Sequence, residues 1–137
     1  MSIRIERYAH GEDDFWERLG PYFASRDVER ELGVSLTSDE SHTWWLGFDN
    51  GNLVGFAAAE RLKNGTNILR HAWIEPEWRG EGIHEQLVDR RLGDLTEAGE
   101  TDFRVTVTDD GIGRYQDRGF EKARTRGQYT ILERHDQ

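Results

Sequence analysis

The residues with the clearest chemical potential in this sequence form a glycine turn, Arg79-Gly80-Glu81-Gly82-Ile83-His84. An apolar run ends at Ile74, Pro76 follows it, and the two glycines then open a segment with helical spacing. That order predicts a strand, a tight turn and the N-terminus of a helix. The first N–H groups of a helix have no intrahelical partners, and the positive end of its dipole favours an anion. We therefore expect the glycine turn to bind a pyrophosphate group.

The segments on either side of the turn position it. Residues 68–74 have strand composition, whereas residues 81–98 repeat apolar side chains at helical spacing until Gly99 ends the helix. Further upstream, residues 42–48 and 53–61 predict the arms of a hairpin around Asp49-Asn50-Gly51-Asn52. The glycine turn therefore follows the third strand of an antiparallel meander.

The remaining elements complete a mixed fold. In chain order we expect a strand at 3–8, helices at 15–23 and 26–32, strands at 42–48, 53–61 and 68–74, a helix at 81–98, a strand at 103–108, a helix at 112–118, and strands at 120–124 and 129–133. Pro21 is expected to interrupt the first helix, while Ser25 and Gly33 bound the second. The fold class is α/β, in the α+β sense: a mainly antiparallel sheet flanked by helices, with one parallel crossover at the glycine turn.

Length and charge limit the classes of partner. The 137 residues fit one domain spanning 1–137, with 35% hydrophobic and 11% aromatic residues to form a core. The formal net charge of −9 disfavours nucleic acid as a partner and favours a cationic small molecule or a basic peptide. A margin of solubility, or adaptation to a salty cytoplasm, would explain the same charge.

The absence of cysteine excludes disulfides, thiolate nucleophiles and cysteine-ligated metals. Histidine and carboxylate residues show no helical metal-ligand spacing, so we expect no metal. The first residues lack the apolar core of a signal peptide, and no stretch reaches the roughly 18 apolar residues of a membrane span. We therefore expect a cytoplasmic protein.

Two motifs resemble those of the GNAT superfamily of acyl-CoA-dependent N-acyltransferases. The glycine turn is similar to its motif A, in which Arg or Gln is followed by two residues, Gly, one residue, and Gly or Ala. The segment Tyr115-Gln116-Asp117-Arg118-Gly119-Phe120 resembles the Tyr-x-x-x-Gly-Phe of motif B. The predicted order of elements is also the GNAT order. The chain departs from the pattern at His84, where motif A has Gly or Ala, at Thr108, where many members carry Asn, and at Gly111, where they carry Ala.

This resemblance implies that acetyl-CoA, or another acyl-CoA, is the co-substrate. The backbone beside the pantetheine arm would come from Trp73, Ile74 and Glu75, and Thr108 stands where a further pantetheine contact is made. The pyrophosphate would bind to the backbone amides of Arg79, Gly80, Glu81, Gly82, Ile83 and His84.

The resemblance also implies catalytic roles. Tyr115 fits the general acid that returns a proton to the departing CoA thiolate, because a phenol stays protonated at neutral pH. The base that takes the proton of the substrate amine is open. His71 needs little perturbation to titrate near neutrality, and Glu60 and Glu75 are carboxylates whose pKa burial could raise.

The sequence thus predicts an N-acetyltransferase that moves an acetyl group from acetyl-CoA to a primary amine by direct attack. The acceptor, a small-molecule or peptide amine, is open. One alternative is a non-catalytic module that binds acyl-CoA or a protein partner; another is an acyltransferase that modifies a macromolecule. A homodimer is compatible with the sequence, because Trp44, Trp45 and Phe48 fit either a core or a dimer face, of which we expect a core.

Overall fold

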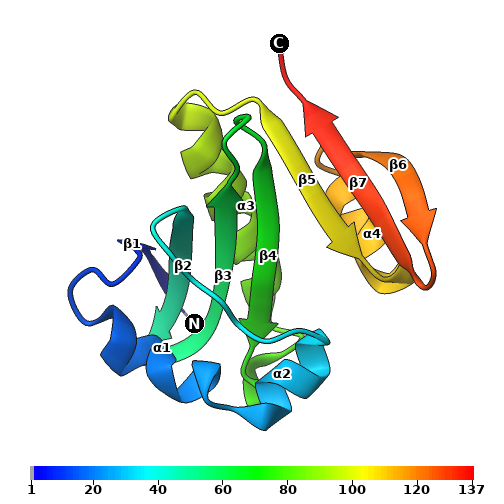
Figure 1. The fold of residues 1–137 in the computed structure, drawn as a ribbon. Coiled ribbons are helices and arrows are strands. Elements are labelled where there is room, and N and C mark those ends of the chain that lie inside the picture. Colours follow the sequence, from blue (N-terminus) through cyan, green and yellow to red (C-terminus); the bar gives the residue numbers. More distant parts are fainter. Residues whose placement is uncertain (1) are drawn as a thin grey trace.

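The computed structural model describes residues 2–137 and has one seven-stranded sheet with helices on both faces (Figure 1). The elements are β1 (Arg4–Ala9), α1 (Phe15–Phe23), α2 (Arg26–Leu32), β2 (His42–Asp49), β3 (Asn52–Arg61), β4 (Asn67–Ile74), the 3₁₀ turn η1 (Pro76–Trp78), α3 (Ile83–Glu97), β5 (Asp102–Val107), α4 (Asp109–Gln116), β6 (Glu121–Arg126) and β7 (Tyr129–His135). The predicted order of strands and helices and the predicted fold class are confirmed.

The sheet has the strand order β1-β2-β3-β4-β5-β7-β6, and its one parallel pair is β4 with β5. These two strands pair only where Asn67, Ile68 and Leu69 lie opposite the segment from Phe103 to Val105. Beyond that point they separate, and Figure 1 shows β4 running toward α2 while β5 runs toward α4. The sheet is therefore closed at the start of β4 and open at its end, beside the glycine turn.

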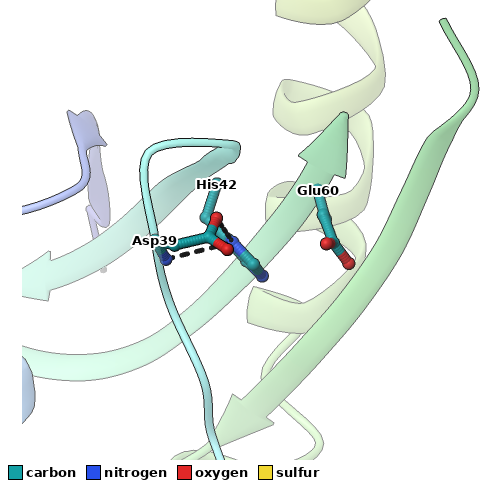
Figure 2. A group of neighbouring side chains, drawn as sticks. All are labelled: Asp39, His42 and Glu60. Atoms are coloured by element: carbon teal, nitrogen blue, oxygen red, sulfur yellow. Dashed lines mark hydrogen bonds and ion pairs between the residues drawn. The ribbon is translucent and has the colours of Figure 1, made fainter. Parts of the chain in front are cut away.

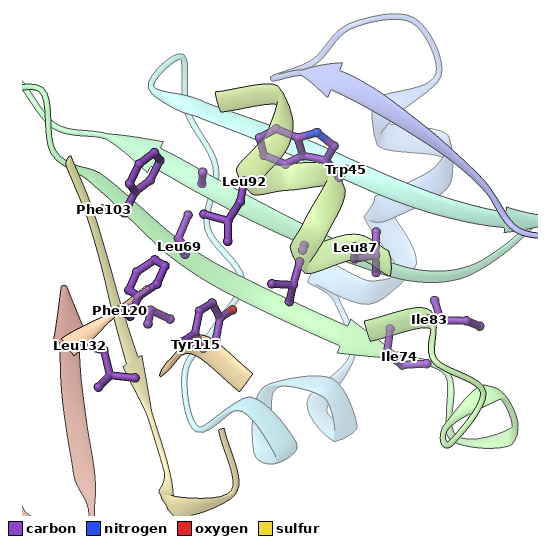
Figure 3. Packing of buried hydrophobic residues seen from close by; sticks show 14 of the residues in the cluster. Trp45, Leu69, Ile74, Ile83, Leu87, Leu92, Phe103, Tyr115, Phe120 and Leu132 are labelled. Carbon is purple, nitrogen blue, oxygen red and sulfur yellow. The ribbon is translucent and has the colours of Figure 1, made fainter. Parts of the chain in front are cut away.

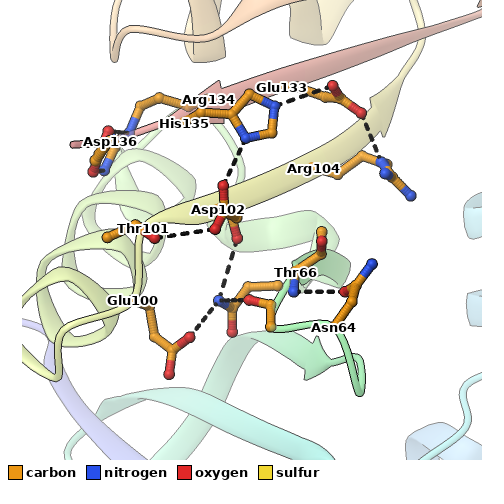
Figure 4. Close-up of polar contacts among 12 residues, drawn as sticks. Asn64, Thr66, Glu100, Thr101, Asp102, Arg104, Glu133, Arg134, His135 and Asp136 are labelled. Atoms are coloured by element: carbon orange, nitrogen blue, oxygen red, sulfur yellow. Dashed lines mark hydrogen bonds and ion pairs between the residues drawn. The ribbon is translucent and has the colours of Figure 1, made fainter.

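The closed end is fixed by a buried asparagine. The Nδ2 of Asn67 donates to Glu100 Oε1 at 2.9 Å and to the Asp102 carbonyl oxygen at 3.3 Å. Figure 4 shows the neighbouring contacts, in which the Asp102 carboxylate meets the His135 ring at 2.8 Å. Because these bonds join β4 to β5 at their first residues, the strands separate only toward their C-terminal ends.

A β-bulge divides β4 at His71. Ala58 of β3 lies opposite Arg70 and Phe56 lies opposite Trp73, so β4 has one residue more than β3 in this interval. His71 takes a φ of +58°, which is uncommon for a residue other than glycine. The bulge ends regular pairing and redirects the side chains that follow.

Two apolar cores lie on opposite faces of the sheet. Trp45, Leu87 and Phe103 belong to the core under α3 and α4 (Figure 3), whereas Trp44 and Phe48 belong to the core under α1 and α2. Consecutive residues of a strand point to opposite faces, so the two tryptophans anchor different cores. The prediction that Trp44, Trp45 and Phe48 form core rather than a dimer face is confirmed, because each is at most 2% exposed.

Two local predictions are wrong. Pro21 lies inside α1 and does not interrupt it, because it removes only its own N–H bond and Ala24 N–H still donates to the Gly20 carbonyl at 3.1 Å. The short helix begins at Asp109 and not near residue 112, because Thr108 is its N-cap residue and acidic residues in a first turn suit the helix dipole. Among residues 2–137, no helix has the length and apolar character needed to cross a membrane.

Candidate active site

A cleft of about 700 Å³ lies at the open end of the sheet. Its walls are the C-terminal ends of α2 and β4, η1, the glycine turn with the start of α3, and α4. The lining residues are Glu31, Leu32, Ala72, Trp73, Ile74, Trp78, Arg79, Gly80, Gly82, Ile83, His84, Glu85, Asp110 and Arg114. Its volume is within the roughly 300–1,000 Å³ of small-molecule and cofactor sites. A second hollow of about 760 Å³ lies between β1 and the end of α3, but neither motif contributes to it. The cleft between β4 and α4 is therefore the candidate active site.

The glycine turn leaves open space beside unpaired amides. Gly80 and Gly82 both have a φ of +81°, and a Cβ added at either would meet no atom within 4 Å. Gly82 is the N-cap residue of α3, and no side chain caps the helix there. Within residues 2–137, no acceptor is found for the first N–H groups of α3, and Gly82, Ile83 and His84 line the cleft. An anion site at a helix N-terminus requires such free N–H groups.

The side chain of Arg79 braces the turn instead of entering it. Its Nε donates to the Ile74 carbonyl at 2.9 Å, and its Nη2 meets the Glu31 carboxylate at 2.5 Å. The guanidinium also lies over the Trp73 ring, 5.5 Å from its centroid. Arg79 thus ties the glycine turn to β4 and α2, and its charge is already paired with a carboxylate.

His84 lines the cleft as a neutral side chain. Burial, and then the charges of Arg114 and Arg91, lower the pKa of His84 to about 4. The ring is therefore uncharged at neutral pH. The side chain that departs from motif A lies close to the arginines of α3 and α4 and adds no positive charge to the site.

Ion pairs hold α4 against α3 on the far wall of the cleft. Arg114 Nε and Arg118 Nη2 each approach the Glu85 carboxylate at 2.6 Å, and Arg118 Nε approaches Asp89 at 2.6 Å. Hydrogen bonds from these guanidinium groups hold the pKa of Glu85 and of Asp89 below their usual range. The pairing fixes the width of the cleft.

The unpaired edge of β4 forms the near wall. The side chain of Trp73 belongs to the core under α1 and α2, and that of Ile74 belongs to the opposite core. The Glu75 N–H is already used, since it donates to the Val54 carbonyl at 2.9 Å. Its carboxylate accepts from Tyr22 at 2.5 Å, and burial together with this bond raises the pKa of Tyr22. The edge that a pantetheine arm could use is therefore the backbone of β4 before Glu75.

Tyr115 lies behind the cleft. It is 3% exposed, and its ring packs against Phe120 with centroids 5.3 Å apart. Its hydroxyl accepts a hydrogen bond from Arg91 Nη2 at 2.6 Å. Arg91 is itself buried, and its Nη1 donates to the Ala58 carbonyl at 3.0 Å.

His71 lies on the opposite face of the sheet, stacked on Trp44 with centroids 5.6 Å apart. Its Nε2 accepts from the Thr37 N–H at 3.4 Å. Burial, and then the charges of Arg70 and His42, lower the pKa of His71 to about 3. The ring is therefore neutral at pH 7, and its lone pair is already occupied.

Glu60 shares that face with a small polar group. Arg70 Nη1 donates to Glu60 Oε1 at 2.9 Å. Figure 2 shows Glu60 beside His42 and Asp39, whose ligand-type atoms all lie within 4.8 Å of one another. Hydrogen bonds from Ser41 and His42 hold the pKa of Asp39 below its usual range. Because these carboxylates already have protein partners, we treat the group as a hydrogen-bonded network.

The structure brings together most of the predicted cofactor residues and separates the catalytic candidates from them. The cleft includes Trp73, Ile74, Arg79, Gly80, Gly82, Ile83 and His84. Glu81 and Thr108 are exposed next to it, and Glu75 is the N-cap residue of η1. Tyr115 is buried behind the cleft, and His71 and Glu60 lie on the other face.

Sequence reasoning missed Arg91 and Arg114. Arg91 follows Ile83 and Leu87 at successive intervals of four residues, so its place on the buried stripe of α3 was the available signal. Arg114 gave no such signal, because its pairing with Glu85 depends on how α4 packs against α3.

The comparisons with known proteins agree with this geometry. Residues 13–130 match the acetyltransferase (GNAT) domain family. Escherichia coli ElaA is similar in structure, with 18% identity and a TM-score of 0.75 over 98% of this chain and 100% of that chain. The ribosomal-protein-S18-alanine N-acetyltransferase of E. coli has 14% identity and a TM-score of 0.73, over 96% and 94% of the two chains. The PaiA N-acetyltransferase of Thermoplasma acidophilum, solved with coenzyme A, has 16% identity and a TM-score of 0.67, over 98% and 99%. The comparison with curated proteins found no match.

The chain belongs to the GNAT acetyltransferase family, since that family matches most of its length. It is an acyl-CoA-dependent N-acetyltransferase, with acetyl-CoA as its co-substrate. The solved structures, each below 25% identity, support the fold alone.

Proposed function

We propose that the enzyme binds acetyl-CoA in the cleft between β4 and α4 and transfers the acetyl group directly to a primary amine. The observation behind this placement is the open space beside Gly80 and Gly82, at the uncapped start of α3. A pyrophosphate in that space would accept hydrogen bonds from the amides of residues 80–84. The predicted contribution of the Arg79 amide is not available, because that N–H already donates to the Pro76 carbonyl at 3.3 Å. The pantetheine arm would lie along the unpaired edge of β4 beside Trp73 and Ile74, with Thr108 across the cleft.

The proposed reaction is a direct acyl transfer. The amine nitrogen attacks the thioester carbonyl carbon, the carbon–sulfur bond breaks, and the sulfur leaves with the electron pair. Tyr115 supplies a proton to that sulfur as the general acid. The sequence has no cysteine to form a thioester intermediate, and holding two reactants in one site accounts for a large part of such catalysis.

Of the candidate bases His71 and Glu60, we assign the role to Glu60, which lies on the opposite face of the sheet from the cleft and would act through water. An amine acceptor is largely protonated at pH 7, so a group near it must take up a proton. The His71 ring is stacked on Trp44 and its Nε2 already accepts from the Thr37 N–H, so its lone pair is not free to take the amine proton. The Arg70 bond to Glu60 uses Oε1, and within residues 2–137 no hydrogen bond to Oε2 is found.

The acceptor class that the charge favours is a cationic amine. The net charge of −9 attracts such molecules at long range. The similarity to the S18-alanine N-acetyltransferase suggests a second candidate, the amino group of a protein, which a peptide screen would identify.

The test combines binding with turnover. Isothermal titration of CoA should give a one-to-one complex, and acetyl-CoA consumption should be measured over polyamines, aminoglycosides, lysine peptides and free N-terminal peptides. At least one amine should be acetylated, with kcat reduced by about 100-fold in Tyr115→Phe. CoA binding without turnover of any amine, and without an effect of Tyr115→Phe, would support a binding module instead. Failure to bind any CoA ester would refute the assignment of the cleft.

A further inference from the structure

Arg91 is a buried cation without a carboxylate partner. It is 1% exposed, and among the described residues 2–137 no salt bridge includes it. Its Nη1 donates to the Ala58 carbonyl at 3.0 Å and its Nη2 to the Tyr115 hydroxyl at 2.6 Å. Its Nε is buried and has no partner. Moving a charged group out of water costs free energy unless the charge is paired or hydrogen-bonded, so the burial of Arg91 without a carboxylate needs a physical explanation.

The guanidinium lies where the sheet opens. Ala58 is at the register shift opposite the bulge of β4, and Tyr115 belongs to α4 on the other side of the separated strands. In Figure 3 the hydroxyl of Tyr115 points from α4 toward α3 and β4. Arg91 therefore links β3 to α4 across the point where β4 and β5 separate.

The charges around Arg91 leave its own charge uncompensated. Arg114 and Arg118 are neutralised by Glu85 and Asp89. His84 is uncharged, and the field of Arg91 is one of the causes that lower its pKa to about 4. The charge of Arg91 therefore acts electrostatically on His84, a side chain that lines the cleft.

We propose that Arg91 is a positioning residue for Tyr115 during acyl transfer. Its N–H occupies a lone pair of the Tyr115 oxygen, which leaves the phenolic proton as the free donor. Its charge then stabilises the phenolate that forms when this proton leaves. The inference rests on the proposed function, because it needs Tyr115 to act as the general acid.

The proton and electron balance is complete. The amine nitrogen bonds to the acetyl carbon, and the carbon–sulfur bond breaks with its electron pair on sulfur. The sulfur takes the proton of Tyr115, which leaves a phenolate beside the Arg91 guanidinium. The nitrogen, now positively charged, loses a proton to water or to Glu60, and the phenolate regains one from water. The products are an N-acetyl amine and free CoA.

A purely structural role is the competing explanation, since Arg91 also satisfies the Ala58 carbonyl at the bulge. The two roles differ in a double-mutant cycle. We would measure kcat and KM for acetyl-CoA in Arg91→Met, Tyr115→Phe and the double variant, with Arg91→Lys as the conservative substitution. Methionine has a similar volume and no charge, and folding is checked by circular dichroism. The measured reaction would be acetylation of the best amine from the screen.

We expect Arg91→Met to lower kcat by about tenfold, the value of one charge-assisted hydrogen bond, with KM for acetyl-CoA changed less than about twofold. Arg91→Lys should recover part of the loss. The double variant should have the kcat of Tyr115→Phe alone, because Arg91 acts only through that hydroxyl. Effects that multiply in the double variant would overturn the proposal in favour of a structural role.

Two further outcomes separate this inference from the proposed function. If Tyr115→Phe is impaired and Arg91→Met is not, the positioning role is refuted and the acid role stands. If Tyr115→Phe keeps its kcat, the acid role and this inference are both refuted, while CoA titration still tests the cleft independently. If Arg91→Met does not fold, the cycle is run with Arg91→Lys. Additive effects of Arg91→Lys and Tyr115→Phe would then refute the proposal.

Discussion

The proposed phosphate site makes a prediction for Gly82 with a matched control in the same chain. Gly82 and Gly51 have the same φ of +81°, and a Cβ added at either meets no atom within 4 Å. Gly82 lines the cleft, whereas Gly51 lies in the hairpin turn between β2 and β3. Substitution by alanine therefore imposes the same backbone strain at both positions, but only Gly82→Ala adds a methyl group beside the proposed pyrophosphate.

The magnitudes follow from the backbone geometry. A residue other than glycine in this left-handed region costs about 1–2 kcal/mol. For a chain of this size about 1 kcal/mol shifts Tm by roughly 4 °C, so each variant should lose about 4–8 °C. The Kd for CoA should rise at least about tenfold in Gly82→Ala, or about 1.4 kcal/mol, because the methyl group blocks close approach of a phosphate to the amides. In Gly51→Ala, Kd should change less than about twofold.

The assay pairs thermal melts by circular dichroism with calorimetric titration of CoA well below each Tm. Equal losses of Tm with unequal losses of affinity are the expected result. If Gly82→Ala binds CoA as tightly as Gly51→Ala does, the glycine turn is not the phosphate site, and its positive φ serves only the chain reversal before α3.

Three further predictions concern charge. Glu60→Gln should lower kcat by about 100-fold if Glu60 is the base. The control is Glu133→Gln, because the Glu133 carboxylate also pairs with an arginine at 2.9 Å and the two side chains are 24% and 27% exposed. This control should leave kcat unchanged, and equal effects of the two substitutions would refute the assignment. The pKa of His71 falls from 6.5 to about 3 on folding, so between these pH values the unfolded state binds more protons than the folded state. The free energy of unfolding should therefore decrease as the pH drops below about 6.5, by up to about 1.4 kcal/mol per pH unit. Urea unfolding at pH 7 and 5.5 measures that loss, which should shrink in His71→Gln; an unchanged loss would show that His71 is not its source. Finally, CoA is anionic and the chain has a net charge of −9, so the two repel each other at low ionic strength. Raising NaCl from about 20 to about 150 mM should therefore leave the Kd for CoA equal or lower. A tenfold increase of that Kd in calorimetric titrations would instead indicate a site based on free arginines.

The order of elements was predictable because local signals mark its boundaries. In the hairpin, Asn50 and Gly51 have φ values of +48° and +81°, as the Asn-Gly sequence predicts for a turn between twisted strands. Ser25 caps α2 by accepting from Val28 N–H at 3.2 Å, and Gly33 ends that helix in the left-handed region. Each signal depends on a few adjacent residues, so no knowledge of tertiary packing was needed.

The environment of the His71 ring, by contrast, could not be predicted from local sequence signals. Its position on the strand before the glycine turn suggested a base that titrates near neutrality. The bulge instead directs the ring onto Trp44 and under Thr37, and burial lowers its pKa to about 3. A positive φ at a histidine has no sequence signal comparable to glycine, and the burial depends on a loop 34 residues away.

The two parts of the candidate site differ in how far the sequence could predict them. Phosphate recognition by backbone amides requires glycines and a helix start, which are local features, so the motif alone indicated the cleft. The environment of Tyr115 depends on Arg91, whose partners Ala58 and Tyr115 are 33 and 24 residues away. The helical pattern placed position 91 on the buried face of α3, where a charged residue conflicts with an apolar stripe. Such a conflict between residue type and position is the sequence signal of a buried cation. Only the fold shows that this cation meets the hydroxyl of motif B, and this contact makes the acid role and the position of Arg91 parts of one testable arrangement.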